Sequence, residues 1–496
     1  MLFNSVDFLI FFPIVTLIYF VIPHRVRYLW LLVCSYYFYM CWNAAYALLL
    51  FGSTLITWLS GLAIDAYKRK GDENSKLQCQ GMVVISFTLN LAILTIFKYT
   101  GFIIGNLNLL FGRIGISFAL REFGLLLPVG ISFYIFQALS YTVDVYRGDV
   151  RVERNLLRYA VFVSFFPQLV AGPIERSSRL LEQFYTERKF HYEQMARGLM
   201  MMLWGYFQKM VIADRLAVLV SQVFDYYTYY SGAQILVGCV FFAFQIYCDF
   251  AGYSCIAIGA AQVMGFDLMQ NFEQPYLATS VAGFWRRWHI SLTSWFRDYL
   301  YIPLGGNRKG RLAKYRNIMI VFLASGLWHG ANWTYVVWGG LNGLFQIIGE
   351  RLRPVRARIK GLLQMDGGTA SGRIMSTLIT FLLIDFTWIF FRADNLSAAF
   401  GILRQLFSRA NLSVLFDGGL YALGLSRIDF TIGLLCVFVL FAVDALHERR
   451  VQIRSWILRQ NLWFRWTVYL AAVFAVLIFG FYGPNYDAAQ FIYFQF

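Results

Sequence analysis

The chain has 496 residues, of which 59% are hydrophobic and only 14% are charged, and its formal net charge is +16. So few charged side chains cannot cover the surface of a soluble protein of this length, so the composition excludes an ordinary soluble enzyme and favours a membrane protein. In a membrane protein the basic excess is explained by cytoplasmic loops that contact anionic lipid headgroups, and no nucleic-acid partner is required.

Apolar runs recur along almost the whole chain and predict an all-α, polytopic integral membrane protein with about ten to twelve transmembrane helices. Many of the runs are long enough to cross roughly 30 Å of hydrocarbon as helices. The clearest are 7–22, 28–42, 44–64, 82–104, 125–143, 159–170, 199–220, 235–264, 318–348, 375–391, 430–445 and 463–481. Nothing basic precedes the first run and no small-residue cleavage site follows it, so we do not expect a signal peptide. We expect one membrane domain over residues 1–496.

Basic residues gather in the polar segments between the runs and predict which loops face the cytoplasm. These basic segments are 25–27, 68–70, 147–158, 351–360 and 449–459. We therefore expect loop 349–373 inside the cell and loop 392–427 outside. The seven cysteines are scattered, without a CxxC pair, so we interpret them as packing residues that form neither disulfides nor a metal site.

Residues 281–302 have one aromatic face and one polar face when they are placed on a helical wheel. The aromatic face holds Phe284, Trp285, Trp288, Leu292, Trp295, Phe296 and Tyr299. The polar face holds Arg286, His289, Thr293 and Arg297 in one line. Such a helix would not face lipid all round, so we expect a helix at the membrane interface or along a wet cavity, ended by Pro303.

Residues 318–348 form a second unusual segment, which is long for one membrane crossing and short for two. Its strongly polar side chains are His329, Asn332, Asn342 and Gln346. Because Gly326 and Gly330 flank His329, we expect a helix that is broken or bent there, as is tolerated where backbone lines a cavity inside a membrane. The GxxxG pair Gly339 and Gly343 predicts close helix packing.

His289 and His329 are the strongest candidates for chemistry. The chain has only five histidines, and burying a group that titrates near neutral pH among tryptophans has a free-energy cost. From the residues alone, two interpretations remain open: these imidazoles perform acid–base chemistry, or they are hydrogen-bonded packing residues between helices. Asp249 and Asp385 also lie in apolar runs, where each needs a partner, and we interpret them as structural anchors rather than proton relays.

Several further motifs, in a fixed order along the chain, point to a known family. They are LPVGISFY at 127–134, YTVDVYRG at 141–148, FFPQLVAGPI at 165–174, FQIYCDFAGYS at 244–254, RDYLYIPLGGNR at 297–308, FFRA at 390–393 and FIYFQF at 491–496. Together with the two histidine segments, this order resembles the membrane-bound O-acyltransferase family. Within the family it is most similar to the membrane subunits of bacterial alginate and peptidoglycan O-acetyltransferases. Cys248 and Cys255 depart from the pattern expected there.

The resemblance implies a helical fold with broken or re-entrant segments around a central cavity, with a histidine-containing core at about 281–348. It implies an enzyme of the bacterial cytoplasmic membrane that moves an acyl group, usually acetyl, from a cytoplasmic thioester to hydroxyls of an extracytoplasmic polysaccharide. The donor would be acetyl-CoA or an acylated carrier protein, with no permanently bound cofactor, and an extracytoplasmic acetyltransferase partner often takes part. His329 is implied as the essential catalytic residue and His289 as a second functional position.

The residue types around the histidines suit that reaction. A neutral imidazole is a suitable general base for an alcohol that attacks a thioester, and burial beside Trp328 would keep His329 neutral. Asn332 could orient the ring or stabilise an oxyanion. Arg286 and Arg297 suggest a site for the phosphates of the donor, with pairing to lipid phosphates as the alternative.

Two other functions compete with polysaccharide acetylation. Within the same family, the chain could transfer D-alanine from a carrier protein to teichoic acid. From another class, a secondary transporter would also have many helices, broken segments and buried Asp and His. The lack of repeated halves and the Trp/Arg/His segment at 281–302 argue against a transporter.

Overall fold

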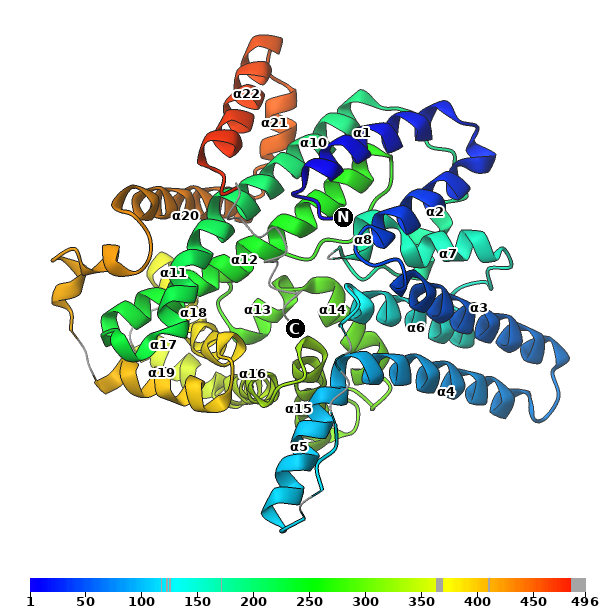
Figure 1. The fold of residues 1–496 in the computed structure, drawn as a ribbon, viewed down its shortest axis with the longest axis horizontal. Coiled ribbons are helices and arrows are strands. Elements are labelled where there is room, and N and C mark those ends of the chain that lie inside the picture. The colour runs from blue at the N-terminus through cyan, green and yellow to red at the C-terminus, as the bar shows by residue number, and fades with distance from the viewer. Residues whose placement is uncertain are drawn as a thin grey trace. The chain divides into compact units, whose positions relative to one another are not determined.

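The computed structural model describes residues 1–116, 118–121, 124, 126–170, 172–362, 369–408 and 411–482, which form helices joined by links (Figure 1). The chain divides into two compact units, residues 1–202 with 256–269 and residues 203–255 with 270–496. It passes from one unit to the other inside α10 (Tyr192–Tyr206) and α12 (Gly232–Val263). The predicted all-α class is confirmed, and the expectation of a single membrane domain stays a prediction. Ala171 and the motif at 491–496 lie outside the described residues.

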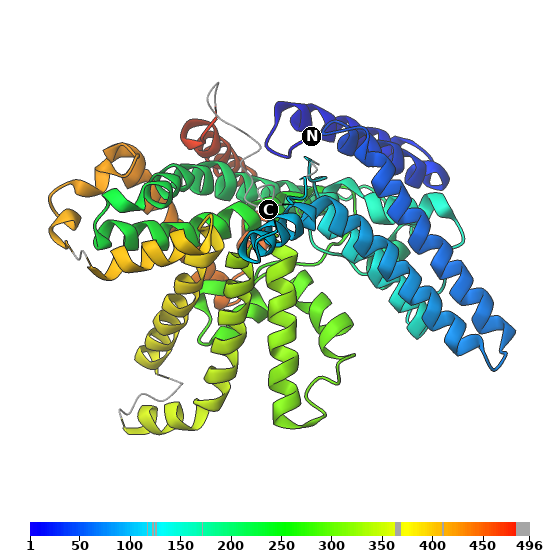
Figure 2. The ribbon, with the colours of Figure 1, turned by 60° about the horizontal axis from the view of Figure 1, so that its bottom comes forward.

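The first unit is built around three long helices. In Figure 2, α3 (Tyr46–Lys70) and α4 (Ser75–Leu94) run side by side, and α6 (Ile131–Arg147) packs against both. Short polar side chains join α3 to α4 inside the unit: Ser53 Oγ donates a hydrogen bond to Asn90 Oδ1 at 2.5 Å. Such bonds replace water for polar groups within an apolar bundle. The remaining helices of this unit are α1 (Val6–Val21), α2 (His24–Met40), α5 (Thr100–Arg113), α7 (Leu156–Ser164), α8 (Phe166–Leu169) and α9 (Ser177–Gln183).

The second unit contains the hairpin of α15 (Gly310–His329) and α16 (Trp333–Arg351). The expected break beside His329 is confirmed, because α15 ends at this residue and α16 begins four residues later. Glycines allow the two backbones to touch: a Cβ at Gly326 would collide with the carbonyl oxygen of Tyr335, and one at Gly339 with that of Phe322. The predicted close packing at the GxxxG pair is therefore confirmed.

The other helices of the second unit surround this hairpin or continue the chain beyond it. They are α11 (Asp214–Asp225), α13 (Val281–Arg287), α14 (Ile290–Phe296), α17 (Arg353–Leu362), α18 (Ala370–Arg392), α19 (Leu396–Ser408), α20 (Arg427–Glu448), α21 (Ile453–Leu458) and α22 (Leu462–Phe479). α18 and α13 both pack against α16. Trp285 on α13 also donates its indole N–H to Asn342 Oδ1 on α16 at 3.2 Å, so α13 is fixed to the hairpin.

A buried cluster of charges lies between a π-helical turn, Phe207–Ala213, and α12 in the second unit. Lys209 Nζ is 2.6 Å from Asp249 Oδ1 and 2.8 Å from Asp214 Oδ1, and the Lys209 side chain is 1% exposed. Asp249, which was expected to need a partner, is therefore paired with this lysine. At Gly252 an added Cβ would lie 2.8 Å from the carbonyl oxygen of Gly205, so the helices approach closely enough for the pairing.

Six helical segments among the described residues are long and apolar enough to cross a membrane. They are Tyr46–Lys70, Ser75–Arg113, Gly232–Val263, Ala370–Arg392, Arg427–Glu448 and Leu462–Phe479. The protein is therefore a multi-pass membrane protein, as predicted. The expected number of ten to twelve crossings, one for each apolar run, stays a prediction. Some of the runs are themselves short: run 7–22 corresponds to the 16-residue α1, and run 159–170 is divided between α7 and α8.

Candidate active site

His289 lies in a break between two short helices. α13 ends at Arg287 and α14 begins at Ile290, and Figure 1 shows them as separate helices. His289 has φ +45° and ψ 53°, a left-handed conformation that non-glycine residues rarely adopt. The expectation of one helix through 281–302 is therefore wrong. The cause is tertiary pairing, since Phe272 forms an antiparallel bridge with Trp288 and interrupts the helical turn just before His289.

His329 is held at the end of α15 by aromatic rings from two other helices. The centroid of its ring is 5.0 Å from that of Trp338 on α16 and 5.3 Å from that of Phe391 on α18. Only 3% of the residue is exposed. Gly330 follows in an extended conformation, and a Cβ at that position would collide with the ring of Tyr335. The glycine therefore lets the chain leave the helix immediately after the histidine.

The fold brings the two predicted catalytic residues together. The centroids of the His289 and His329 rings are 6.3 Å apart. Trp328 contacts both, at 5.7 Å from His289 and 4.9 Å from His329. Phe250 on α12 covers another side of His289 at 4.7 Å. Two imidazoles from different helix ends thus lie in one aromatic environment, close enough for both to act on one reacting group.

Burial determines the charge state of His289. The residue is 1% exposed and belongs to a link between short helices, outside the six apolar segments. Loss of hydration disfavours the imidazolium and lowers the pKa of His289 to about 3. The ring is therefore neutral at physiological pH and can accept a proton or donate a hydrogen bond, depending on its tautomer.

The arginines predicted to bind the donor are placed differently from His289. Arg286 and Arg297 are exposed, whereas His289 is buried, because the break at His289 ends the helical line on which all three were placed. Arg297 Nε is 2.8 Å from Asp298 Oδ1, and this hydrogen bond raises the pKa of the guanidinium above its usual value. Arg287, which lies between them in sequence, donates two hydrogen bonds to the carboxylate of Glu448, at 2.8 and 3.0 Å.

Asn332 has a structural contact that the sequence did not indicate. Its side-chain oxygen accepts the backbone N–H of Thr334 at 3.1 Å and so caps α16, and its amide donates to the carbonyl oxygen of Asp394 at 2.8 Å. These bonds fix the entry to α16 and tie it to the segment after α18. Asn332 therefore supports the turn that follows His329, and its role in orienting the ring or stabilising an oxyanion stays a prediction.

Sequence reasoning missed the aromatic residues that α12 and α18 place beside the histidines. Trp388 and Phe391 on α18 are fully buried beside Trp338, and Trp388 lies 5.1 Å from Trp288. Both lie in or next to the FFRA motif, which was the only sequence signal for them. Phe250 was part of the motif at 244–254, but nothing in its spacing pointed to His289.

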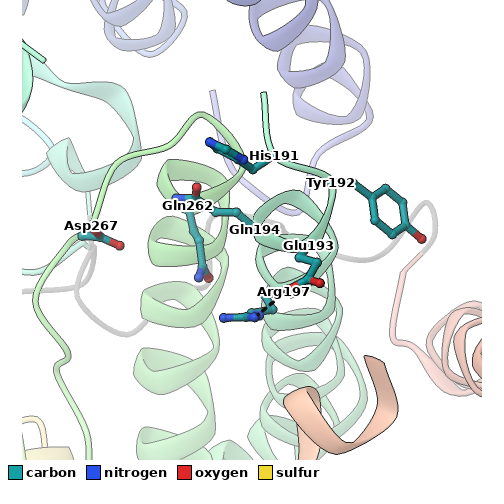
Figure 3. Close-up of a pocket in the computed structure, with 7 residues that line it drawn as sticks. All are labelled: His191, Tyr192, Glu193, Gln194, Arg197, Gln262 and Asp267. Carbon is teal, nitrogen blue, oxygen red and sulfur yellow. Dashed lines mark hydrogen bonds and ion pairs between the residues drawn. The ribbon is translucent and has the colours of Figure 1, made fainter. Parts of the chain in front are cut away.

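A pocket in the first unit contains none of the residues predicted to be functional. It has a volume of about 560 Å³ and is lined by His191, Tyr192, Glu193, Gln194, Arg197, Gln262 and Asp267. Figure 3 shows these side chains around the start of α10 and the end of α12. The pocket is polar, and the guanidinium of Arg197 in it is already paired with Glu193 at 3.1 Å.

Comparisons with known proteins point to one family. The model of the membrane-bound O-acyltransferase family matches residues 88–382, which include both histidines. A "Probable alginate O-acetylase AlgI" from Pseudomonas putida is 41% identical over 412 residues, 82% of this chain and 80% of the relative. A "Peptidoglycan O-acetyltransferase" from Helicobacter pylori is 34% identical, with 82% and 80% covered. A "Teichoic acid D-alanyltransferase" from Bacillus subtilis is 27% identical, with only 42% and 56% covered.

Proposed function

Because this chain belongs to the membrane-bound O-acyltransferase family and is an O-acyltransferase, we propose that it acetylates the hydroxyls of a polysaccharide outside the bacterial cytoplasmic membrane. The donor is a cytoplasmic thioester, acetyl-CoA or an acylated carrier protein. An extracytoplasmic acetyltransferase partner completes the transfer to the polymer. The relatives that match most of the chain are named for alginate and peptidoglycan acetylation, which supports this acceptor class.

The observation that carries the proposal is the pair of buried imidazoles whose ring centroids are 6.3 Å apart. In the proposed reaction His329 accepts the proton of the attacking hydroxyl as its oxygen bonds to the thioester carbonyl carbon. The C–S bond then breaks, and the thiolate leaves and takes up a proton. His289, neutral at physiological pH, hydrogen-bonds the oxygen that becomes negative during the attack. The aromatic surroundings exclude water, which strengthens both interactions.

Transfer of D-alanine to teichoic acid is the second candidate within the family. Its support is weaker, because the relatives with that name match less than half of this chain. The transporter interpretation is set aside, since the chain belongs to an acyltransferase family.

The proposal is tested with the purified membrane protein, in the presence and absence of its extracytoplasmic partner. The protein is given envelope polysaccharide and either labelled acetyl-CoA or a D-alanylated carrier protein. We expect acetyl esters on the polysaccharide, and their loss from the envelope of cells that lack the gene. Transfer of D-alanine without transfer of acetyl would contradict the proposal. Acetyl transfer to no polysaccharide, with or without the partner protein, would contradict the acceptor class.

We predict that Arg286→Gln and Arg297→Gln each raise KM for the thioester donor several-fold and leave KM for the acceptor unchanged. A donor such as acetyl-CoA carries phosphates that exposed guanidinium groups bind, whereas a hydroxyl acceptor need not. Initial rates at varied donor and acceptor concentrations give both constants. The matched control is Arg287→Gln, because the Arg287 side chain is only 30% exposed and is paired with Glu448 on α20, whereas Arg297 is 63% exposed and is paired with its own neighbour Asp298. If donor KM stays constant in the first two variants, these arginines contact lipid instead.

We predict that loop 349–373 is cytoplasmic and loop 392–427 extracytoplasmic, because the basic residues of 351–360 favour the inside. Single cysteines are introduced as Ser371→Cys or Leu412→Cys, both exposed positions, in a background where the exposed native Cys41 is replaced by serine. An impermeant thiol reagent added to intact cells should label the Leu412→Cys variant and not the Ser371→Cys variant. Labelling at position 371 from outside would contradict this predicted topology.

A further inference from the structure

Three buried polar side chains meet next to the backbone of His289. The amide nitrogen of Asn271 donates to Ser254 Oγ at 2.9 Å, and Ser291 Oγ donates to Asn271 Oδ1 at 2.6 Å. All three residues are at most 2% exposed. Hydrogen bonds in such a dry environment are not exchanged for bonds to water, so they fix the side chains strongly. Ser254 belongs to α12 and Ser291 to the first turn of α14, so Asn271 joins these two helices.

The main chain of Asn271 holds the residue that follows His289. Its carbonyl oxygen accepts the N–H of Ile290 at 2.9 Å, and two residues later the N–H of Glu273 donates to the carbonyl oxygen of Arg287 at 3.0 Å. His289 is therefore enclosed between two backbone hydrogen bonds from one short segment. These bonds define where α13 must end and where α14 can begin.

This enclosure explains the unusual backbone of His289. A left-handed conformation is unfavourable for a non-glycine residue, and it persists only where the surroundings impose it. The ring is then directed against Phe250, which lies one helical turn before Ser254 on α12. Asn271 thus connects the strained turn that carries His289 to the same stretch of α12 that the His289 ring packs against.

We propose that Asn271 is a positioning residue for His289, acting through Ser291 and Ser254 and touching neither donor nor acceptor. The inference rests on the proposed role of His289 in acyl transfer. Removing the Asn271 side chain allows the turn to relax toward ordinary helical geometry, which moves the imidazole away from the reacting oxygen. A displacement of about 1 Å in a catalytic group lowers a rate on the order of 100-fold.

The test measures kcat per folded molecule for Asn271→Ala and Ser291→Ala, with folded protein quantified by monodisperse elution and thermal melting. We expect both to lower kcat about 10- to 100-fold and to leave both KM values within two-fold. Ser35→Ala is the matched control: this serine is also fully buried and accepts one hydrogen bond, from the N–H of Phe166 at 3.0 Å. It should lower the melting temperature without lowering kcat per folded molecule.

A double-variant comparison separates positioning from a general role in folding. If Asn271 acts through His289, Asn271→Ala added to His289→Ala causes no further loss of kcat. An additional 10-fold loss in the double variant would overturn the inference. If His289→Ala lowers kcat but Asn271→Ala does not, only the positioning role is wrong. If His289→Ala itself keeps wild-type kcat, the proposed role of His289 is wrong instead.

Discussion

Replacing His329 with alanine or glutamine should abolish acyl transfer while the protein still folds and inserts into membranes. General-base catalysis contributes on the order of 10²–10⁴-fold to a rate, so the remaining activity should be at or below one per cent of wild type. Glutamine keeps much of the ring's volume between Trp338 and Phe391. The measurement is ester formation on purified polymer, normalised to the amount of folded protein in the membrane fraction.

The matched control for this prediction is His191→Ala. His191 is exposed and lines the pocket of Figure 3 in the first unit. We expect it to retain wild-type activity, which shows that loss of a histidine is not harmful in itself. Near-normal ester formation by folded His329→Gln protein would exclude a catalytic role for His329. His329 would then be a packing residue between helices.

Lys209→Met should strongly destabilise the protein, because it removes a buried cation that is paired with two carboxylates. Asp249 and Asp214 both contact the Lys209 ammonium inside the unit, and methionine would leave two buried carboxylates without their cation. Breaking a buried ion pair by removing one partner costs about 3–5 kcal/mol. The melting temperature in detergent and the amount of protein in the membrane measure the effect.

Lys314→Met is the control that separates burial from charge. Lys314 Nζ is 2.6 Å from Glu350 Oε1, but 28% of the lysine side chain and 41% of the glutamate side chain are exposed. Exposed pairs contribute roughly 0–1 kcal/mol, so this variant should melt close to wild type. Asp249→Asn should fall between the two, because it leaves Lys209 paired with Asp214. Equal melting temperatures for Lys209→Met and Lys314→Met would show that the cluster does not stabilise the fold.

Local sequence features predicted one of the two histidine environments well. The break at His329 was predicted from Gly326 and Gly330, the glycines on both sides of it. These are properties of adjacent residues, so a reader of the sequence can find them. The close contact of α15 and α16 was indicated in the same way, by Gly339 and Gly343.

The environment of His289 could not be predicted in that way. Residues 281–302 have good helical periodicity, but the helix is interrupted because Phe272 pairs with Trp288 and Asn271 accepts the N–H of Ile290. Periodicity reports only which faces of a segment are apolar and contains no information about a second segment that competes for its backbone hydrogen bonds. The partner of Asp249 was missed for a similar reason, since Lys209 lies on another helix.

The contact between the α15 and α16 backbones also affects how inherited variation in this protein is interpreted. A methyl group at Gly326 or Gly339 has no space beside the facing carbonyl oxygen, and one at Gly330 has none beside the ring of Tyr335. We expect a substitution that adds a single carbon there to shift the helix end that carries His329 and to inactivate the enzyme, although every reactive group remains. Loss of activity on substitution at these three positions would therefore reflect a steric requirement of the fold. A genetic screen alone would not distinguish these glycines from catalytic residues.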